Sequence, residues 1–457
     1  MVDSTPFSVP AWMPAAFGDV RAAGGTVIRF YANWSSVAPD TRPADPGSPV
    51  DPAYDWSTLD QQVSTAKGLG LEPILSIESA PPYAEGQGEG LAGTVRPSPT
   101  EYALFARAAA RRYSGSFQGL PRVRYWQAWN EPNYFRHLGP QYNTPLSQPV
   151  RPSSRLLSPA IYRGLVNAFA DSVHRVHSDN LVIAGGLTPF GNENADTHVA
   201  RTMPFMRALL CMNSRDRPER GCRARIKFDV WSHHPYTSGG PRHHNIADED
   251  ISLGDLPEMG RLLRAAIRAG HVVSRRHIQW WATEFSWDTD PPDPNALPMW
   301  LHKRWVAEAL YRMWRSGISL VTWFGIRDSA SARPGEGVFQ CGLYFGCQGG
   351  PECWRPKPSL TAFRFPFVAF KGRAGVRIWG RTPWGRRGRV VIEHRDGGWQ
   401  RVATLRSDRY GIFTRTLRAP RRGYLRARLL PASGQPGELS VPFSLKDVPD
   451  RSVDPFG

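Results

Sequence analysis

The chain has 457 residues, of which 41% are hydrophobic and 21% are charged. This is the composition of a globular protein with a full-sized core, and it excludes a disordered chain. No segment approaches the run of about 20 apolar residues that a membrane helix needs. The first residues lack the charged start and apolar stretch of a signal peptide, so we expect a cytosolic protein or an exported one whose signal is removed.

The formal net charge is +17 at pH 7, and most of the basic residues are arginines. Residues 371–457 contain 19 Lys and Arg against 7 Asp and Glu, a net of +12, which leaves +5 for the first 370 residues. This basic end is either an arginine-rich solvated surface or a patch that attracts polyanions such as acidic polysaccharide or an anionic cell envelope. No nucleic-acid recognition motif accompanies it, so we expect no nucleic-acid partner.

Segments typical of strands and helices alternate through the first 360 residues. The predicted strands are 26–34, 72–80, 123–133, 181–190, 228–236, 278–287 and 318–328. The predicted helices are 14–24, 56–70, 100–115, 158–177, 202–211, 256–270 and 301–317. Strands separated by helices at this spacing predict a parallel sheet wrapped by helices, and the length favours an eight-stranded (β/α)₈ TIM barrel. The strand that should precede 14–24 is short, irregular or missing.

The pattern changes after residue 370. Short alternating runs separated by Gly, Pro, Asp and Ser predict a small antiparallel β-sandwich. We therefore divide the chain into a catalytic α/β barrel over 1–370, a C-terminal β-sandwich over 371–446 and a polar tail over 447–457.

Five cysteines indicate the compartment. Cys211 and Cys222 bracket an arginine-rich loop, and Cys347 and Cys353 bracket a short QGGPE loop. Such loops favour two disulfides, with Cys341 free or competing for Cys347, and hence an oxidising compartment and a secreted protein. A zinc cluster is the alternative, but no CxxC pair or histidine at ligand spacing supports it.

No other motif calls for a metal or a cofactor. The chain has no GxGxxG fingerprint and no P-loop, so no nucleotide cofactor is expected. The pair His243-His244 and the aspartates at 288, 290 and 293 lack the spacing of metal ligands. We expect no metal ion and no cofactor.

Two predicted strands end in glutamate, Glu131 within Asn-Glu-Pro-Asn and Glu284 within Ala-Thr-Glu-Phe. Carboxylates are rarely buried unless they are paired or working, and in barrels of this kind the catalytic groups lie where strands end. Glycoside hydrolysis is the chemistry that uses two carboxyl groups across a cavity. The alternative is structural: Glu131 caps the following loop, and Glu284 pairs with an arginine such as Arg29.

The segments YWQAWNEPN (125–133) and TEFSW (283–287) resemble the acid/base and nucleophile motifs of clan A glycoside hydrolases. WNEPN in particular resembles family 39, which includes β-xylosidases, α-L-iduronidases and biofilm-exopolysaccharide endoglycosidases. The resemblance covers residues 25 to about 370. It implies a retaining glycosidase acting on an oligo- or polysaccharide, anionic ones included, with Glu131 as general acid/base and Glu284 as the nucleophile that forms a covalent intermediate.

The same resemblance assigns binding positions around the two glutamates. They are Arg29, Asn130, His233 or His234, Tyr236 and Trp323. Arg29 would orient the nucleophile, Asn130 would bind the 2-hydroxyl of the sugar, and Trp323 would form a floor beneath it. Either histidine could face inward to contact the nucleophile with Tyr236.

Tryptophan is abundant, with 17 residues in the chain. Trp34, Trp129, Trp287 and Trp323 lie at predicted strand ends, where about half of them are expected to stack on sugar rings, with Trp34 and Trp287 among the candidates. Barrel packing is the alternative for each.

Two other functions share these residues. A carbohydrate-binding pseudoenzyme would hold a glycan without cleaving it, although the presence of both Glu131 and Glu284 argues against it. A transglycosidase would use the same glutamates and differ only in how well water competes for the intermediate.

Overall fold

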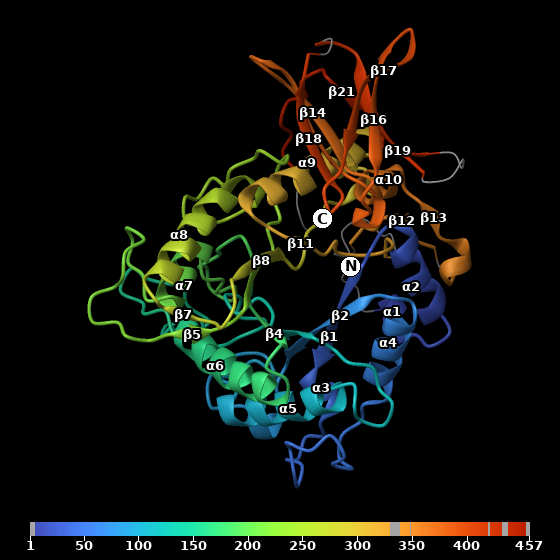
Figure 1. Cartoon of the computed structure of the whole chain (residues 1–457). Helices are drawn as coiled ribbons and strands as arrows, with labels where there is room; N and C mark the ends of the chain where they lie inside the picture. The colour runs from blue at the N-terminus through green and yellow to red at the C-terminus, as the bar shows by residue number, and fades with distance from the viewer. Residues whose placement is uncertain (1–4, 330–338, 348, 419–420, 432–436, 454–457) are drawn as a thin grey trace.

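The computed structural model describes residues 5–329, 339–347, 349–418, 421–431 and 437–453. Figure 1 shows two parts, a parallel sheet enclosed by helices and a set of antiparallel strands, coloured orange to red, that lies beside α9 and α10. No helix in these ranges combines the length and apolar character needed to cross a membrane.

The first part is built on a curled sheet of seven strands in the order β1-β2-β3-β4-β6-β8-β11. Their bounds are β1 (Val27–Asn33), β2 (Glu72–Glu78), β3 (Tyr125–Ala128), β4 (Leu181–Leu187), β6 (Val230–His233), β8 (Gln279–Ala282) and β11 (Leu320–Val321). All neighbouring pairs are parallel. Each strand falls within one of the seven predicted segments, and the expected barrel-type α/β fold is confirmed.

Helices connect these strands and cover the outside of the sheet (Figure 1). They are α1 (Thr5–Ser8), α2 (Met13–Ala22), α3 (Trp34–Val37), α4 (Ser57–Gly68), α5 (Pro99–Arg112), α6 (Ser158–Val176), α7 (Thr202–Leu209), α8 (Leu256–Arg268), α9 (Met299–Ser316) and α10 (Pro358–Arg364). Short 3₁₀ turns are η1 (Pro82–Ala84), η2 (Leu253–Asp255), η3 (Pro351–Cys353) and η4 (Pro383–Gly385).

The expected irregularity of the first barrel strand is confirmed within the described residues, where no strand of the sheet precedes α2. Within the described residues the sheet ends at β1 on one side and at β11 on the other. The segment before α2 forms the one-turn helix α1, whose Phe7 packs against Phe17 and Phe30 with ring centroids 4.8 and 6.3 Å apart. Pro6 and Pro10 lack the N–H that a strand needs for its ladder, which explains why this segment packs through a side chain.

The barrel interior changes from apolar to polar along each strand. Ile74, Leu181, Ile183, Val230 and Trp281 form a separate buried cluster inside the sheet. Because alternate residues of a strand share a face, residues two and four positions further along point to the same interior. The polar groups described below therefore lie above this apolar floor, at the carboxyl ends of the strands.

The second part contains two antiparallel sheets, as expected for a β-sandwich. One has the order β14-β15-β18, and the other has β17-β16-β19-β20 with β21 also paired to β19. Their bounds are β14 (Phe367–Gly372), β15 (Gly375–Arg381), β16 (Arg389–Asp396), β17 (Gly398–Arg406), β18 (Ile412–Leu417), β19 (Tyr424–Leu430), β20 (Glu438–Leu439) and β21 (Phe443–Ser444). Two-stranded pairs elsewhere are β5 (Ile226–Lys227) with β7 (Val272–Val273), β9 (Thr289–Asp290) with β10 (Leu297–Pro298), and β12 (Tyr344–Phe345) with β13 (Arg355–Pro356).

Helix α9 joins the two parts. The Tyr311 and Trp314 rings of α9 lie 5.5 and 5.6 Å from the ring of Trp379 on β15. The Arg304 guanidinium donates to the Ser444 carbonyl at 2.8 Å and lies 4.0 Å from the Phe443 ring centroid. An aromatic and cationic contact of this kind fixes the sandwich on the barrel.

The described part of the predicted polar tail also contacts the barrel. Asp450 accepts from the Gly240 N–H at 2.6 Å and pairs with His243 at 2.8 Å. Disulfides join Cys211 to Cys222 and Cys347 to Cys353, and Cys341 is a buried free thiol.

We expect Trp379→Ala to destabilise the protein by about 3–5 kcal/mol, because it removes a large ring that is only 2% exposed from the junction of the two parts. The measurement is the midpoint of guanidinium unfolding, followed by tryptophan fluorescence and far-UV circular dichroism. The exposed Arg401→Ala on β17 is the control and should leave the midpoint unchanged. A loss below about 1 kcal/mol for Trp379→Ala would contradict a packed junction.

Candidate active site

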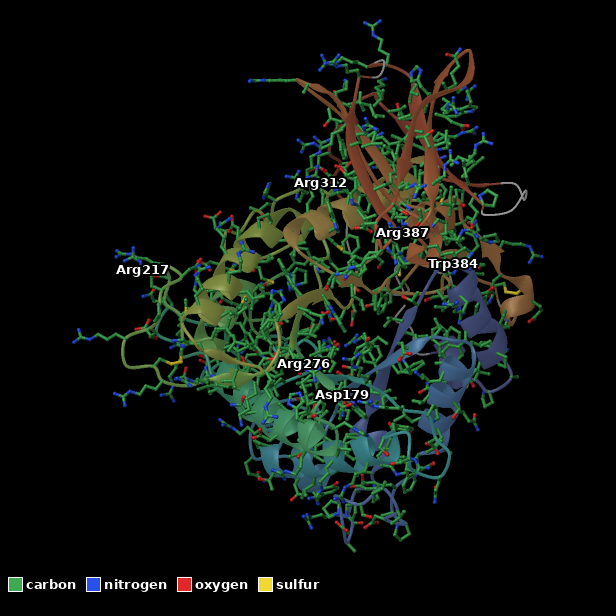
Figure 2. The ribbon with its side chains drawn as sticks, in the orientation of Figure 1. Asp179, Arg217, Arg276, Arg312, Trp384 and Arg387 are labelled. Carbon is green, nitrogen blue, oxygen red and sulfur yellow. A yellow bond between two sulfur atoms is a disulfide. The ribbon has the colours of Figure 1, made fainter. Side chains whose placement is uncertain are left out.

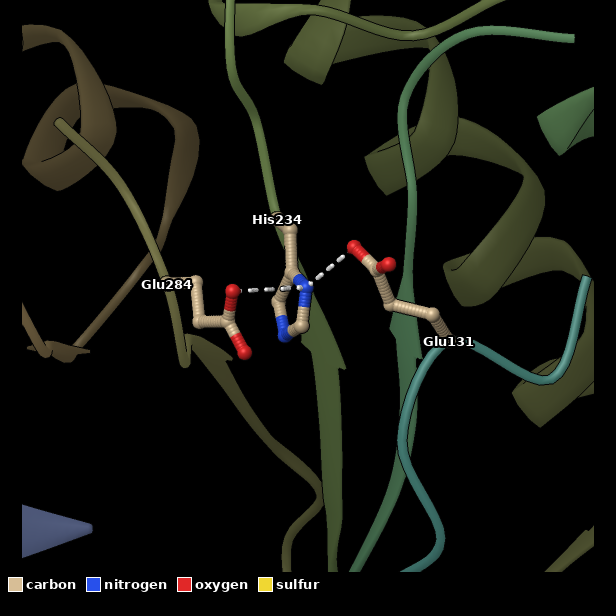
Figure 3. A group of neighbouring side chains, drawn as sticks. All are labelled: Glu131, His234 and Glu284. Carbon is tan, nitrogen blue, oxygen red and sulfur yellow. Dashed lines mark hydrogen bonds and ion pairs between the residues drawn. The ribbon is translucent and has the colours of Figure 1, made fainter. Parts of the chain in front are cut away.

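Two glutamates face each other across a histidine at the carboxyl ends of the barrel strands (Figure 3). Nδ1 of His234 lies 2.9 Å from Oε1 of Glu131 and 3.6 Å from Oε2 of Glu284. One carboxylate oxygen of each glutamate and a ring nitrogen of His234 lie within 4.8 Å of one another. Glu131 follows β3, His234 follows β6 and Glu284 follows β8, so three separate strand ends meet here.

The backbone around Glu131 is in an unusual conformation. Trp129 and Glu131 have φ angles of 68° and 38°, a left-handed region that costs energy for residues with a Cβ. The indole N–H of Trp129 donates to the His137 carbonyl at 2.7 Å, and the Glu131 N–H donates to the Gly186 carbonyl at 3.0 Å. These contacts hold the turn that directs the Glu131 carboxyl into the site, and strain of this kind is concentrated at functional sites.

Glu284 is held at both carboxylate oxygens. Its Oε1 accepts from Nη1 of Arg29 at 2.6 Å and from the Tyr31 hydroxyl at 2.6 Å, and its Oε2 accepts from the Tyr236 hydroxyl at 3.2 Å. Burial alone would raise the pKa of Glu284, but its interactions with His234, Arg29 and Tyr31 together lower that pKa below its ordinary value. Glu284 is therefore an anion at neutral pH.

Arg29, which pairs with the ionised Glu284, is itself held by hydrogen bonds from its other N–H groups. Its side chain is fully buried on β1. Its Nε donates to Gln127 at 2.9 Å, and Nη2 donates to Ser76 at 3.1 Å and to Oδ1 of Asn130 at 2.7 Å. The guanidinium thus connects residues from β2, β3 and the segment after β8, and Asn130 is oriented by the same group that orients Glu284.

Glu131 has the opposite protonation behaviour. Burial first, and the negative charge of Glu284 second, raise the pKa of Glu131 to about 8, against the lowering effects of His137 and Arg29. Burial lowers the pKa of His234 to about 4, so its imidazole is neutral at pH 7. The site therefore holds one protonated and one ionised carboxyl side by side, which is the division of roles that an acid and a nucleophile require.

His234 and Tyr236 lie in this site together with Arg29 and Asn130, but His233 does not. The His233 imidazole is fully buried and hydrogen-bonds the Ile251 carbonyl at 2.7 Å, outside the sheet. Successive residues of a strand point to opposite faces, so only one of the two histidines can face the interior. The expectation that left His233 as a substrate contact is corrected here.

The tryptophans expected to stack on sugar also differ from the prediction. Trp34, Trp287 and Trp323 are 0%, 1% and 0% exposed, and Trp129 is likewise buried. Trp34 stacks on Phe105 at 5.4 Å, while the indole N–H groups of Trp287 and Trp323 donate to main-chain carbonyls. Their rings fill the space behind the strand ends, so packing is the correct alternative and none presents a face to a ligand.

Sequence reasoning missed three polar neighbours, Tyr31, Glu78 and His137. Tyr31 lies two residues after Arg29 on β1, and Glu78 ends β2 four residues after the interior Ile74, so strand alternation would have placed both inside. No comparable signal exists for His137, which lies in a loop.

Glu78 is a third carboxyl of the site. Burial, with the charges of Glu284 and Glu131, raises its pKa to about 8, against the effect of Arg29. Its buried Oε2 makes no hydrogen bond in the described structure. His137 lies between the carboxyls, with Nδ1 3.8 Å from Oε2 of Glu78 and Nε2 3.6 Å from Oε2 of Glu131.

The same side chains also provide potential metal donors, since Glu131, His234 and Glu284 each direct one ligand atom to a common point. A cation there would compete with the positive charge of Arg29, which already binds the Glu284 carboxylate at 2.6 Å. The arrangement therefore fits an organic substrate between two carboxyls better than a metal ion.

Comparisons with known proteins place the fold. No protein-family model matches the chain, and no curated protein matches it. Among solved structures, a family 39 glycoside hydrolase from the gut symbiont Bacteroides cellulosilyticus superposes with a TM-score of 0.53 at 15% identity, over 91% of this chain and 80% of that one. A glucosidase from Croceicoccus marinus gives a TM-score of 0.48 at 15% identity, over 87% of this chain and 88% of that one. At 15% identity, the similarity to the family 39 structure is one of fold, and it agrees with the barrel and sandwich described above.

Proposed function

We propose that this chain is a retaining glycoside hydrolase that cleaves an oligo- or polysaccharide through a covalent glycosyl-enzyme intermediate. The observation that carries the proposal is the pair Glu131 and Glu284, with carboxylate oxygens within 4.8 Å and opposite protonation at neutral pH. Retaining glycosidases separate their two carboxyls by about 5–5.5 Å, whereas inverting enzymes leave about 6.5–9.5 Å for a water molecule. The short separation favours direct attack by a carboxylate.

In the first step Glu284 attacks the anomeric carbon, and the bond from that carbon to the leaving oxygen breaks. The leaving oxygen keeps the electron pair and takes the proton of Glu131. Oε1 of Glu284 accepts the two short hydrogen bonds from Arg29 and Tyr31, whereas Oε2 has longer contacts, 3.2 Å with the Tyr236 hydroxyl and 3.6 Å with Nδ1 of His234. Oε2 is therefore the freer oxygen and the one we assign as nucleophile.

In the second step a water molecule attacks the same carbon and the ester to Glu284 breaks. Glu131 is ionised once it has given up its proton, and esterification of Glu284 removes the charge that, after burial, contributes to the raised pKa of Glu131, so Glu131 becomes a stronger acid than before. The ionised Glu131 accepts the proton of the attacking water, and both glutamates return to their starting states. One residue thus acts as acid and then as base because its neighbour loses and regains charge.

Asn130 completes the sugar site in this proposal. Its Oδ1 is engaged by Arg29, so its amide N–H groups remain to donate to a sugar oxygen. A contact of this type to the 2-hydroxyl strengthens in the transition state. The two disulfides agree with an exported enzyme.

The geometry of the two glutamates argues against a pseudoenzyme but is equally compatible with a transglycosidase. A pseudoenzyme has no need for two buried carboxyls in opposite protonation states, so we place it second. A transglycosidase uses the same first step, and only the acceptor of the second step distinguishes it.

The test is product release from aryl glycosides and polysaccharides by wild type, Glu284→Gln and Glu131→Gln. We expect Glu284→Gln to lose several orders of magnitude on every substrate that wild type cleaves. Glu131→Gln should lose about 10²–10⁴-fold on substrates with a poor leaving group, because general acid catalysis is worth that much. With a nitrophenyl leaving group its first step should survive and the glycosyl-enzyme should accumulate. Equal activity of Glu284→Gln and wild type would disprove the assignment.

We expect kcat/KM to follow a bell-shaped dependence on pH. Activity should fall above about pH 8, where Glu131 loses the proton it must donate, and below the ordinary glutamate range near 4.5, where Glu284 gains a proton. The measurement is kcat/KM from pH 3 to 10 on one aryl glycoside. The alkaline limb should disappear in Glu131→Gln, and its persistence there would show that another group is the acid.

We expect Glu78→Gln to lower kcat/KM about 3- to 10-fold, because its unbonded oxygen is placed to bind a sugar hydroxyl, Glu78 is protonated at neutral pH, and a hydrogen bond between neutral groups contributes about 0.5–1.5 kcal/mol. The matched control is Glu72→Gln at the opposite end of β2, where the carboxylate pairs with Lys67 at the surface. Kinetics for both variants on one substrate decide the point. A Glu78→Gln enzyme within threefold of the control would exclude a substrate contact.

A further inference from the structure

A hollow of about 590 Å³ lies at the junction of α9 and the β-sandwich, apart from the residues of the active site. One wall is a face of α9 that presents Trp300, Lys303, Arg304 and Ala307, spaced by three or four residues so that they share that face. The opposite wall comes from β16, β19 and β21 and the chain that follows β21. We call it the junction hollow.

Two aromatic rings line the junction hollow with much of their surface open. Trp300 is 56% exposed and Tyr424 is 45% exposed. This contrasts with the tryptophans at the strand ends, which are buried. Open aromatic rings in a concave surface are the feature that stacks on the C–H face of a sugar, and exposed apolar surface in a hollow marks a binding site.

The cations of the junction hollow are mostly unneutralised. Lys303, Arg395 and Lys446 line it and make no ion pair with any residue that the structure describes. The lining includes one carboxylate, Asp447, which is paired with Lys371 at 3.0 Å. Side chains with nitrogen atoms at their tips project widely from the sandwich (Figure 2). Lys303, Arg395 and Lys446 differ in that they line one concave surface together with aromatic rings.

Strand register places these groups together. Arg395 pairs directly with Tyr424 across β16 and β19, and Tyr424 pairs with Ser444 across β19 and β21. Directly opposed residues of neighbouring strands point to the same face of a sheet. A ring and a cation are thus adjacent on the sandwich wall, as Trp300 and Lys303 are on α9.

Topology relates the junction hollow to the active site. Helix α9 begins 15 residues after Glu284, at the end of the loop that leaves β8. In a barrel of this kind the loop that follows a strand, and the start of the next helix, lie at the end that carries the catalytic groups. Trp300, the second residue of α9, therefore lies at that end of the barrel.

We propose that the junction hollow binds a segment of an acidic polysaccharide, with the rings of Trp300 and Tyr424 against sugar faces and with Lys303, Arg395 and Lys446 paired to its acid groups. The acid group is a carboxylate of a uronic acid or a sulfate ester, since both present the oxygens that these cations bind. This binding goes beyond the proposed hydrolase activity and does not depend on it.

The test measures binding, so it stands whether or not the chain is an enzyme. The full chain carrying Glu284→Gln, which prevents turnover, is titrated with polygalacturonate, chondroitin sulfate, a neutral galactan and single-stranded DNA at two salt concentrations. The site variants are Trp300→Ala, Tyr424→Ala and the triple variant Lys303→Ala/Arg395→Ala/Lys446→Ala. The controls are Tyr410→Ala, a ring 59% exposed outside the hollow, and the triple variant Arg401→Ala/Arg406→Ala/Arg415→Ala, which removes the same charge from exposed strand positions.

We expect at least one acidic polymer to bind, and each site variant to weaken that binding about tenfold or more, with the controls within twofold of the parent. Polygalacturonate and chondroitin sulfate then distinguish carboxylate from sulfate, and the galactan should not bind. Equal losses in the two triple variants would overturn the proposal, because the attraction would then be that of net charge alone. So would DNA binding that depends on Trp300, unchanged binding in Trp300→Ala, or no binding of either acidic polymer. Unfolding midpoints equal to the parent's confirm that each variant is folded.

Discussion

The buried ion pair of Arg29 and Glu284 is the interaction on which the site depends. A guanidinium with no access to solvent requires partners for its donors, and Arg29 finds them on Glu284, Gln127, Ser76 and Asn130. Removing one member of such a buried pair leaves an uncompensated charge and typically costs about 3–5 kcal/mol. Because these partners come from different strands, the pair also fixes how the ends of β1, β2 and β3 and the chain after β8 sit relative to one another. The position of the Glu284 carboxylate is thus fixed by the packing of the barrel.

The charge of Glu284 in turn sets the state of its neighbours. With Glu284 ionised beside Arg29 and Tyr31, Glu131 and Glu78 each keep a raised pKa, to about 8, through burial and repulsion. Only Glu131 lies within hydrogen-bonding distance of His234, while Glu78 keeps a buried oxygen without a hydrogen bond. Two carboxyls with similar pKa values are therefore suited to different tasks. In the proposed mechanism Glu131, beside Glu284, transfers the proton, and Glu78, whose Oε2 has no hydrogen bond among the described residues, receives a donor from the ligand.

The fold could be predicted from sequence because each barrel strand is a β-rich run bounded by turn residues, and the acidic pair because Glu131 and Glu284 end two such runs. The missing strand was visible as a segment interrupted by Pro6 and Pro10. The predictions that failed concern the face of the sheet toward which a side chain points. Alternation alone would have separated His233 from His234 and brought in Tyr31 and Glu78. Burial of Trp34, Trp287 and Trp323 could not be foreseen, because a ring at a strand end is as suited to fill the space behind the sheet as to line a cleft, and only tertiary packing decides. His137 reaches the site from a loop, where neither periodicity nor spacing constrains a side chain.

The two proposed ligand-binding regions differ in the charged groups that they offer a ligand, and this limits what a single polymer could place in each. The proposed active site contains three carboxyls, of which only Glu284 is ionised at neutral pH, and the guanidinium of Arg29 among them is already bonded at Nε, Nη1 and Nη2. An acid group on the sugar held there would face Glu78 and Glu284 without a free cation among the groups described for the site, so a neutral or amino sugar suits that position better. The junction hollow is cationic, since Lys303, Arg395 and Lys446 line it and form no ion pair within the part of the chain that the structure describes. If both proposals hold, the glycan that satisfies both regions carries its acid groups on units other than the one that is cleaved. Electrostatics then selects the register of the chain as well as its composition, because sliding the polymer to bring an acidic unit to Glu284 would move acid groups away from the cations and toward the carboxyls.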